Sequence, residues 1–264
     1  MGNRLRDIVV VVDCTKLKLK QLDHFSINFE YHYAVQGFIY TRLNKPLSLF
    51  RDLHDRKEYK FFCFSNIFAG QHKMFNLIIS SPNDKFIEEI SNDLSQLIGS
   101  HSPIQIGDTQ FVLQNIIVFS YKNLVFPLKL VTATPIILRI PRNKVLREVE
   151  AYSAPHNEVY WRNNYPMSLF IDGVESNLDK KYRDYTALRT KKDINHRIFA
   201  EYKFKKQVST KIRLHNTDVT VIGSLWELGF SSEIDEAVQI FALDCGLGER
   251  NSLGFGFVNE LNTT

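Results

Sequence analysis

Residues 245–259 read CGLGERNSLGFGFVN, and this stretch decides how the rest of the chain is interpreted. Gly246, Gly248, Gly254 and Gly256 have the spacing G-x-G-x5-G-x-G. Glycine has no side chain, so its backbone adopts positive φ angles and approaches another chain or a phosphate closely. A simple turn does not need four such positions, and the array therefore predicts a binding loop. The alternative is a glycine-rich turn that leads into an apolar strand over 253–258.

The residues before the loop predict a helix. Apolar residues recur at helical spacing up to residue 245, with Ser232 as the expected N-cap and Gly246 as the C-terminal stop. Dinucleotide-binding and P-loop motifs have the reverse order, in which the loop opens a helix, so a nucleotide-dependent enzyme is the weakest of the functions considered. The C-terminal end of a helix carries the negative end of its dipole. An anion at this loop would therefore depend on backbone N–H groups and on Arg250.

The same stretch resembles the C-terminal glycine-rich loop of the CRISPR repeat-processing endoribonucleases, the Cas six family. Two further segments extend this resemblance. FEYHYAVQGFIYTRL, at residues 29–43, resembles the first helix of that family, and LKLVTATPIIL, at residues 128–138, resembles the strand that opens its second domain. The resemblance implies two ferredoxin-like domains side by side and RNA as the partner.

The order of predicted elements agrees with this fold class. In the first half we predict a strand over 6–12, helices over 30–43 and 47–53, strands over 59–68 and 74–80, a helix over 82–98 and a strand over 110–119. After a boundary at Phe126 and Pro127 we predict a strand over 128–140, a helix near 164–182, strands near 199–204, 208–215 and 219–224, a helix from 232 and a closing strand. Each half approximates β-α-β-β-α-β. We expect an α+β protein of two tandem ferredoxin-like domains, residues 1–125 and 126–264, with a C-terminal glycine-rich loop.

The charges are unevenly distributed along the chain. The formal net charge is +4, but residues 178–213 hold twelve Lys and Arg against four Asp and Glu. Tyrosines and phenylalanines are interleaved with these charges, a pattern typical of a surface that binds a phosphate backbone, although a solvated face has the same composition. The residues expected to bind RNA are Arg189, Lys191, Lys192, Lys203, Lys205 and Lys206, with Gly246, Gly248, Arg250, Asn251, Ser252, Gly254 and Gly256 of the loop.

Three residues fit the chemistry of a metal-independent ribonuclease. In the helix over 30–43, Tyr40 is expected opposite the apolar stripe, where it would be free to act. His54 follows in a charged loop and Lys60 at the start of the next strand. The resemblance implies Tyr40, His54 and Lys60 as the catalytic set: His54 as general acid or base, Tyr40 as its proton-transfer partner, and Lys60 as electrostatic stabiliser. Members of the family also use a histidine of the first helix. His32 is therefore the alternative, although its position at the edge of the apolar stripe favours packing.

The expected function is cleavage of CRISPR repeat RNA in precursor transcripts by attack of a 2′-OH, without metal or cofactor. The products would carry a 2′,3′-cyclic phosphate and a 5′-OH. The alternative is a non-catalytic subunit of a CRISPR effector complex that binds repeat RNA or serves as a structural part. Expected partners are the repeat RNA and an effector complex that receives the product, with the protein itself a monomer or homodimer. Apolar runs too short for a membrane span and scattered cysteines predict a soluble, cytoplasmic protein without structural zinc.

Overall fold

The structure is a computed structural model, and it describes residues 7–13, 31–69, 74–100, 103–107, 109–121, 123–148, 158–187, 197–214 and 217–261. The chain divides into two compact units. The first unit consists of Met1–Lys122, Lys211–Val219 and Ser252–Gly254, and the second of Asn123–Thr210, Thr220–Asn251 and Phe255–Thr264. The segment Ser252–Gly254, which we call the loop tip, thus groups with the first unit, whereas the flanks of the glycine-rich loop group with the second.

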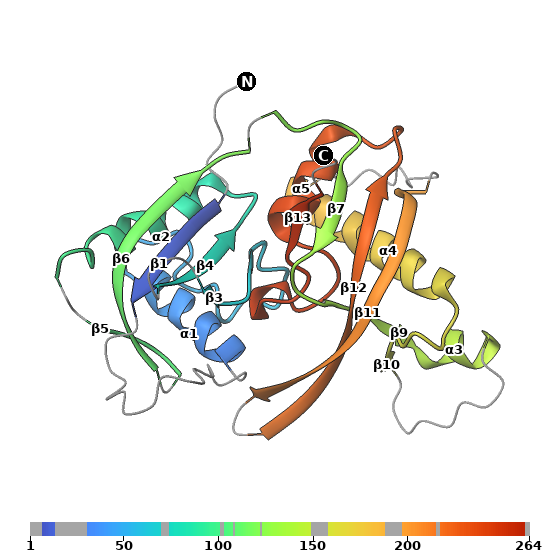
Figure 1. Cartoon of the computed structure of the whole chain (residues 1–264), viewed down its shortest axis with the longest axis horizontal. Helices are drawn as coiled ribbons and strands as arrows, with labels where there is room; N and C mark the ends of the chain where they lie inside the picture. The colour runs from blue at the N-terminus through green and yellow to red at the C-terminus, as the bar shows by residue number, and fades with distance from the viewer. Residues whose placement is uncertain are drawn as a thin grey trace. The chain divides into compact units, whose positions relative to one another are not determined.

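The first unit is an antiparallel sheet with helices. Its elements are β1 (Asp7–Asp13), α1 (Tyr31–Leu43), β2 (Cys63–Phe64), β3 (Phe68–Ala69), β4 (Met74–Ser80), α2 (Asp84–Ser95), β5 (Pro103–Ile106) and β6 (Thr109–Phe119) (Figure 1). The strand order is β2-β4-β1-β6-β5, with β3 also paired to β4. The first strand, β1, thus lies between β4, which precedes α2, and β6, the last strand of the unit. This is the ferredoxin-like topology, extended by the edge strand β5.

The core of the first unit lies between its helices and its sheet. Side chains alternate along β1, so Ile8 and Val10 are buried on the side that carries the helices. The helix α1 buries Val35 and Ile39 against them, one turn apart. The helix α2 begins after Asn83, whose side chain accepts a hydrogen bond from the N–H of Lys85 and so caps the helix.

The second unit repeats this topology. Its elements are β7 (Lys129–Thr132), β8 (Ile136–Ile137), β9 (Arg139–Pro141), α3 (Arg142–Glu148), β10 (Glu158–Tyr160), α4 (Met167–Thr186), β11 (Phe199–Leu214), β12 (Thr217–Phe230), α5 (Glu236–Cys245), the 3-10 turn η2 (Asn251–Leu253) and β13 (Val258–Glu260) (Figure 1). The strand order β11-β12-β7-β13 again places the first strand between the third and the fourth. The expected fold class, α+β with tandem ferredoxin-like units, is confirmed.

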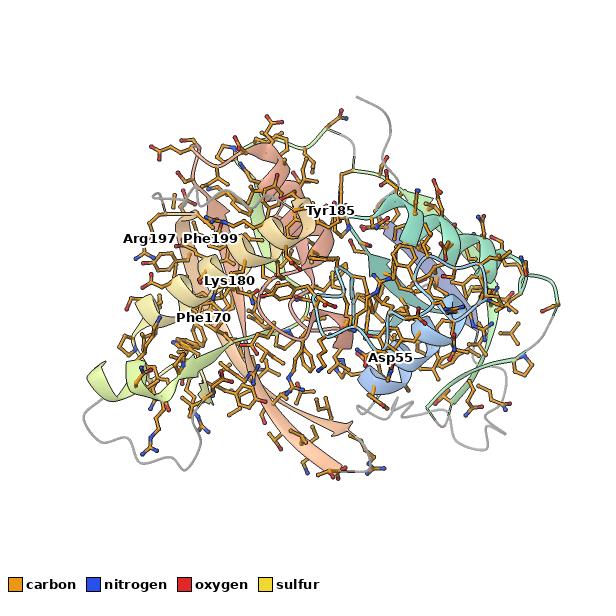
Figure 2. All side chains as sticks on the ribbon, turned by 180° about the vertical axis from the view of Figure 1, so that it is seen from behind. Asp55, Phe170, Lys180, Tyr185, Arg197 and Phe199 are labelled. Carbon is orange, nitrogen blue, oxygen red and sulfur yellow. The ribbon has the colours of Figure 1, made fainter. Side chains whose placement is uncertain are left out.

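Aromatic side chains join α4 to the second sheet. Trp226 of β12 stacks on Phe170 of α4, with ring centroids 4.2 Å apart and planes at 12°. Phe241 of α5 contacts the rings of Tyr182 and Tyr185 on α4. Figure 2 labels Phe170, Tyr185 and the exposed Lys180 on this helix.

None of the helices in the described ranges is long and apolar enough to cross a membrane.

Several predicted boundaries in the first half are wrong. The expected helix over 47–53 is a succession of turns in which the N–H of Leu53 donates to the carbonyl of Phe50. The expected strand over 59–68 is broken into β2 and β3, and the positive φ of 50° at Phe61 shows that the chain turns before β2. The edge strand β5 was not predicted, because four residues give too short a pattern to recognise.

Predicted boundaries in the second half also need correction. The strand over 128–140 is divided into β7, β8 and β9, while the three strands predicted over 199–224 form only β11 and β12. Polar residues near the middle of β11 give the appearance of a break, but a strand that is exposed on both faces tolerates them. Ser232 is not the N-cap, because α5 begins after Asp235. The closing strand is β13, whereas residues 251–253 form η2, and α3 and β10 were not predicted.

Candidate active site and glycine-rich loop

One face of α1 carries His32, Gln36 and Tyr40, each four residues after the last and therefore one helical turn apart. His32 and Gln36 bind the loop tip. His32 Nδ1 lies 2.8 Å from the Leu253 carbonyl oxygen. Gln36 Nε2 donates to the carbonyl oxygen and the Oγ of Ser252, each at 3.0 Å. The loop tip is thus held to α1 by two side chains that lie one helical turn apart, His32 and Gln36.

His32 is buried, with 5% of its surface exposed. A carbonyl oxygen only accepts hydrogen bonds, so Nδ1 of His32 carries the proton that is donated to Leu253. Burial lowers the pKa of His32 below 6.5, and the hydrogen bond to Leu253 opposes this shift. The ring also stacks on Tyr31 at 4.7 Å. His32 therefore acts as a neutral anchor of the loop tip in this geometry, which agrees with the packing role expected from its position.

The expectation that Tyr40 lies on an open face of α1 is wrong. Its side chain is half-buried against the core. Its ring meets Phe62 nearly at right angles, at 6.1 Å. Burial raises the pKa of Tyr40, the side chain of Ser252 lowers it, and the nearby Tyr33 raises it further. The phenol consequently keeps its proton at neutral pH and is available as a hydrogen-bond donor.

His54 lies on the turn that follows α1 and touches Tyr40. Leu53, 3% exposed, anchors this turn in the core, whereas 63% of the His54 side chain is exposed. The rings of Tyr40 and His54 meet edge to face, with centroids 5.4 Å apart and planes at 90°. His54 Nδ1 lies 3.0 Å from Oδ1 of Asp55, the exposed residue labelled in Figure 2. Because a carboxylate only accepts, this contact places the proton on Nδ1 and leaves the lone pair on Nε2.

Lys60 reaches back to the same turn. Its Nζ donates to the carbonyl oxygens of Leu53 at 2.5 Å, His54 at 3.3 Å and Arg56. These acceptors match the three protons of an ammonium group. Burial lowers the pKa of Lys60 and the positive charge of Arg56 adds to this effect, while Glu58 and Asp55 oppose it. The structure thus brings together Tyr40, His54 and Lys60, with Lys60 holding the main chain of the turn that presents His54.

The flanks of the glycine-rich loop pack tightly against the second unit. Gly248 and Gly256 have φ angles of 71° and 70°, a region that only glycine adopts easily. A Cβ at Gly248 would clash with the carbonyl of Ile137, and one at Gly256 with the carbonyl of Leu247. Both glycines are buried. Packing within the protein therefore already requires these glycines, and their expected contact with RNA stays a prediction.

A buried lysine of α4 organises these flanks. Lys181, 1% exposed, donates from Nζ to the carbonyl oxygens of Gly246 at 2.6 Å and Gly248 at 3.3 Å and to Oδ1 of Asn251 at 2.9 Å. Asn251 in turn donates to the carbonyls of Leu247 and Phe255. In the sequence, Lys181 stands out only as part of the basic stretch 178–213. Its helical spacing from the buried Val174 and Leu178 could have identified it as an inward-facing residue.

Arg250 is the residue that the loop holds in an unusual backbone conformation. Its backbone φ angle is 59°, a value that is uncommon for residues other than glycine and asparagine. The preceding Glu249 is fixed by the N–H of Arg139 at 2.9 Å and by its Nε at 2.6 Å. The half-exposed guanidinium of Arg250 has no hydrogen-bond or ion-pair partner among the residues that the structure describes. It is therefore available to an anion.

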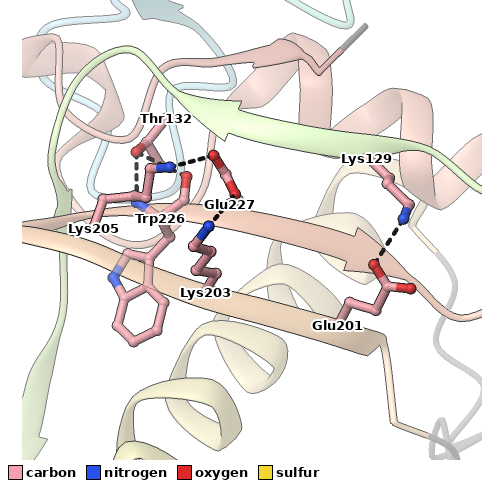
Figure 3. Close-up of polar contacts among 7 residues, drawn as sticks. All are labelled: Lys129, Thr132, Glu201, Lys203, Lys205, Trp226 and Glu227. Carbon is pink, nitrogen blue, oxygen red and sulfur yellow. Dashed lines mark hydrogen bonds and ion pairs between the residues drawn. The ribbon is translucent and has the colours of Figure 1, made fainter. Parts of the chain in front are cut away.

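Carboxylates neutralise part of the predicted basic zone. Glu227 of β12 forms ion pairs with two lysines of β11 (Figure 3). Its carboxylate oxygens lie 3.9 Å from Nζ of Lys203 and 2.5 Å from Nζ of Lys205. In the same figure Lys129 of β7 pairs with Glu201 at 2.8 Å. Lys206 is exposed. Arg189, Lys191 and Lys192 lie outside the described residues.

Comparisons with known proteins agree with this architecture. A family model for CRISPR associated protein Cas6, C-terminal, matches residues 122–260. The CRISPR-associated endoribonuclease Cas6 2 of Methanocaldococcus jannaschii is 27% identical over 266 residues, which cover 93% of this chain and 98% of that protein. The CRISPR-associated endoribonuclease Cas6 of Haloferax mediterranei is 25% identical over 256 residues, which cover 89% of this chain and 88% of that protein.

Solved structures have the same fold. One described as CRISPR associated protein Cas6 has a TM-score of 0.68 at 21% identity and covers 97% of this chain and 99% of its own. Another is described as a RAMP protein that binds different RNA substrates. It has a TM-score of 0.71 at 21% identity, and the match covers 97% of this chain and 100% of that one. Since the family model spans more than half of the sequence, the chain belongs to the Cas6 family of CRISPR-associated proteins.

Proposed function

We propose that this protein is an endoribonuclease that cleaves CRISPR repeat RNA in precursor transcripts and so produces guide RNAs. Its family and the names of its relatives support RNA cleavage as the activity. The observation that carries the mechanism is the edge-to-face contact of Tyr40 with His54, on a turn held by Lys60. The proposal assigns catalysis to the domain of residues 1–125 and RNA binding mainly to that of residues 126–264.

The proposed reaction is an intramolecular transesterification. The ribose 2′-OH gives its proton to a base, its oxygen forms a bond to the adjacent phosphorus, and the bond from phosphorus to the 5′ oxygen breaks as that oxygen takes up a proton. The products are a 2′,3′-cyclic phosphate and a 5′-OH. This sequence needs one proton acceptor and one proton donor, both of which side chains can supply near neutral pH.

The side chains of the first unit are suited to these roles. His54 has an exposed imidazole whose Nε2 lone pair can accept a proton, and as imidazolium it can return one. Tyr40 is its proton-transfer partner, because burial favours the protonated phenol. Lys60 supplies positive charge to the developing phosphorane. Its donors already face carbonyl oxygens, so direct contact with a phosphate requires exchange of one of these bonds.

RNA binding is assigned to the glycine-rich loop and to exposed basic residues. Arg250 is the strongest candidate for a phosphate contact, because its guanidinium is available and its backbone is held in place on both sides. Lys206 is a second candidate, while Lys203 and Lys205 must share their charge with Glu227. We retain Arg189, Lys191 and Lys192 as predicted contacts.

The test is cleavage of a labelled repeat RNA in EDTA, beside the same RNA with a single 2′-deoxy substitution at each candidate position. We expect metal-free cleavage at one position, abolished by one 2′-deoxy, with a 2′,3′-cyclic phosphate on the upstream product. Binding without cleavage would instead identify a non-catalytic RNA-binding subunit. Cleavage that requires a divalent metal would contradict the mechanism, although not the activity.

A further inference from the structure

The exposed residues of α1 form a single ridge. The helix is described over its whole length, and its exposed residues are Tyr33, Gly37 and Thr41, each four residues after the last. Residues four apart are neighbours on a helix surface, so the three make one continuous strip, which we call the α1 ridge. Tyr33 is 37% exposed. The α1 ridge carries no charge, although the solvent face of a helix is usually charged.

The helix α2 of the same unit has an ordinary solvent face. Its exposed residues are all charged or polar: Lys85, Glu88, Asn92 and Ser95. Side chains of this kind keep a helix surface in water. The tyrosine and the glycine at the exposed positions of α1 therefore need a different explanation.

Packing within the protein does not require a glycine at position 37. Glycine destabilises the interior of a helix relative to alanine. The backbone of Gly37 is helical, and a Cβ there would meet nothing within 4 Å. Every other glycine that the structure describes has either a positive φ or an atom within 4 Å of its added Cβ. An exposed helical glycine without a packing role indicates that a ligand comes close to the backbone.

The backbone at Gly37 offers such a ligand no free acceptor. Its carbonyl oxygen accepts the hydroxyl of Thr41 at 2.8 Å, in addition to the N–H that helix geometry places there. These two donors use both lone pairs of the oxygen. The group that fits is therefore one that makes van der Waals contact, such as a ribose or a flat ring. The exposed ring of Tyr33, one turn away, provides a surface on which a base can stack.

The α1 ridge is continuous with the proposed catalytic residues. Gly37 precedes Tyr40 by three residues, a spacing that also makes helical residues neighbours, and the ring of Tyr40 lies 5.4 Å from that of His54. At about 1.5 Å per residue, Gly37 is about 4.5 Å and Tyr33 about 10 Å from Tyr40 along the helix axis. Successive nucleotides of a strand are about 3.4 Å apart. RNA with a phosphate at His54 thus has a base near Tyr33 within about three nucleotides.

We propose that the α1 ridge is an RNA-binding subsite, in which a base within about three nucleotides of the scissile phosphate stacks on Tyr33 and the adjoining ribose lies against the bare backbone at Gly37. Every base has a π-face, so the stacking does not select a sequence. It instead holds the strand in place beside His54. This inference rests on the proposed function, because it places the scissile phosphate at His54.

The test is a thermodynamic cycle between Tyr33→Ala and removal of one base from the RNA. Dissociation constants are measured for the full chain and repeat RNAs with an abasic nucleotide at each of the three positions on either side of the cleavage site. A 2′-deoxy at the cleavage site keeps these RNAs uncut. Tyr33→Ala should weaken binding of the unmodified repeat roughly 5- to 150-fold, the contribution of one stacked base, whereas Tyr33→Phe should bind like wild type. At one abasic position Tyr33→Ala should have no further effect.

A second arm fills the space at Gly37. Leucine is a good helix former, so Gly37→Leu keeps the helix while its side chain covers the backbone. We expect weaker RNA binding without loss of thermal stability, and a smaller effect of the same sign from Gly37→Ala. The matched control is Asn92→Ala on the exposed face of α2, which also replaces a poor helix former. It should leave RNA binding unchanged.

The outcomes separate this inference from the proposed function. Unchanged affinity in Tyr33→Ala, or the same loss at every abasic position, would overturn the stacking on Tyr33. Unchanged affinity in Gly37→Leu would overturn the contact at Gly37. Wild-type protein that binds the repeat without cleaving it would refute the proposed function, while the cycle, run with an abasic nucleotide at every position, still decides whether Tyr33 stacks on a base. Failure of the wild type to bind the repeat would refute both.

Discussion

At the scale of single residues, His32 and His54 have different environments in the folded protein. His32 is 5% exposed and donates to a main-chain carbonyl, whereas the side chain of His54 is 63% exposed beside Tyr40. An accessible imidazole can exchange protons with a substrate, while a buried one that is already bonded serves as an anchor. These environments lead to separate predictions for the two histidines.

Replacement of His54 by alanine should lower single-turnover cleavage about 10²- to 10⁴-fold, the usual contribution of a positioned general acid or base. RNA affinity should change little, because the imidazole is one exposed group among many contacts. Cleavage and binding assays on the same RNA check this result. A loss of this size in His32→Ala, with fold and affinity intact, would make His32 the catalytic histidine.

His32 should make stability depend on pH. Burial depresses its folded-state pKa below 6.5, so between these two values the unfolded chain binds a proton that the folded chain does not. Acidification through this window therefore destabilises the protein, by up to about 1.4 kcal/mol per pH unit. In His32→Asn, which keeps a donor for Leu253, this part of the loss should disappear. Urea unfolding of both proteins at about pH 7.5 and about pH 5.5 measures it, and parallel losses would contradict the prediction.

At the scale of elements, α4 carries two adjacent lysines with opposite roles. Lys181 is buried and bonds Gly246, Gly248 and Asn251, while Lys180 is exposed. Lys181→Met should reduce the free energy of unfolding by about 1–3 kcal/mol, because it leaves buried acceptors unpaired. The control Lys180→Met should stay within about 0.5 kcal/mol of wild type. Denaturant unfolding measures the free energy of unfolding of both variants. Equal changes in the two variants would mean that the buried hydrogen bonds of Lys181 contribute nothing to stability.

Two glycines likewise make a matched pair. Gly256 has a φ of 70° and no room for a Cβ, so Gly256→Ala should cost at least about 1–2 kcal/mol of stability. Gly37 of α1 is exposed, and a Cβ there meets nothing within 4 Å. Gly37→Ala should therefore stabilise the protein by about 0.8–1.0 kcal/mol through helix propensity. Thermal unfolding of the two variants should shift in opposite directions, and a stabilised Gly256→Ala would refute the close packing.

At the scale of the whole molecule, pairing between strands reduces the charge that RNA can use. Glu227 neutralises Lys203 and Lys205, whereas Lys206 is exposed. Each phosphate of single-stranded RNA that is neutralised adds about 0.7 to the slope of log K against log salt. Lys206→Ala should lower that slope by about 0.7, and Lys205→Ala should lower it by less. Binding titrations over a range of salt concentrations measure both, and the reverse order would show that RNA displaces Glu227.

Much of the architecture could be predicted from the sequence. The periodic apolar residues of α1 and α2 and the order of strands and helices gave the ferredoxin-like class, because burial of one face imposes a period on the side chains. Boundaries failed where local patterns are weak, as in the two-residue strands β2 and β3. The proximity of Tyr40, His54 and Lys60 was expected from a family resemblance and not from spacing, since periodicity within α1 wrongly placed Tyr40 on an open face.

The sequence by itself determined the class of fold, the glycine array and the residue types available for proton transfer. Only the tertiary structure decided how distant residues meet: that Lys181 faces inward to the loop, that His32 anchors Leu253, and that Gln36 binds Ser252. The reason is physical. A sequence pattern records which side chains must be buried along one element, whereas a hydrogen bond between residues 36 and 252 depends on where distant segments meet after the chain has folded.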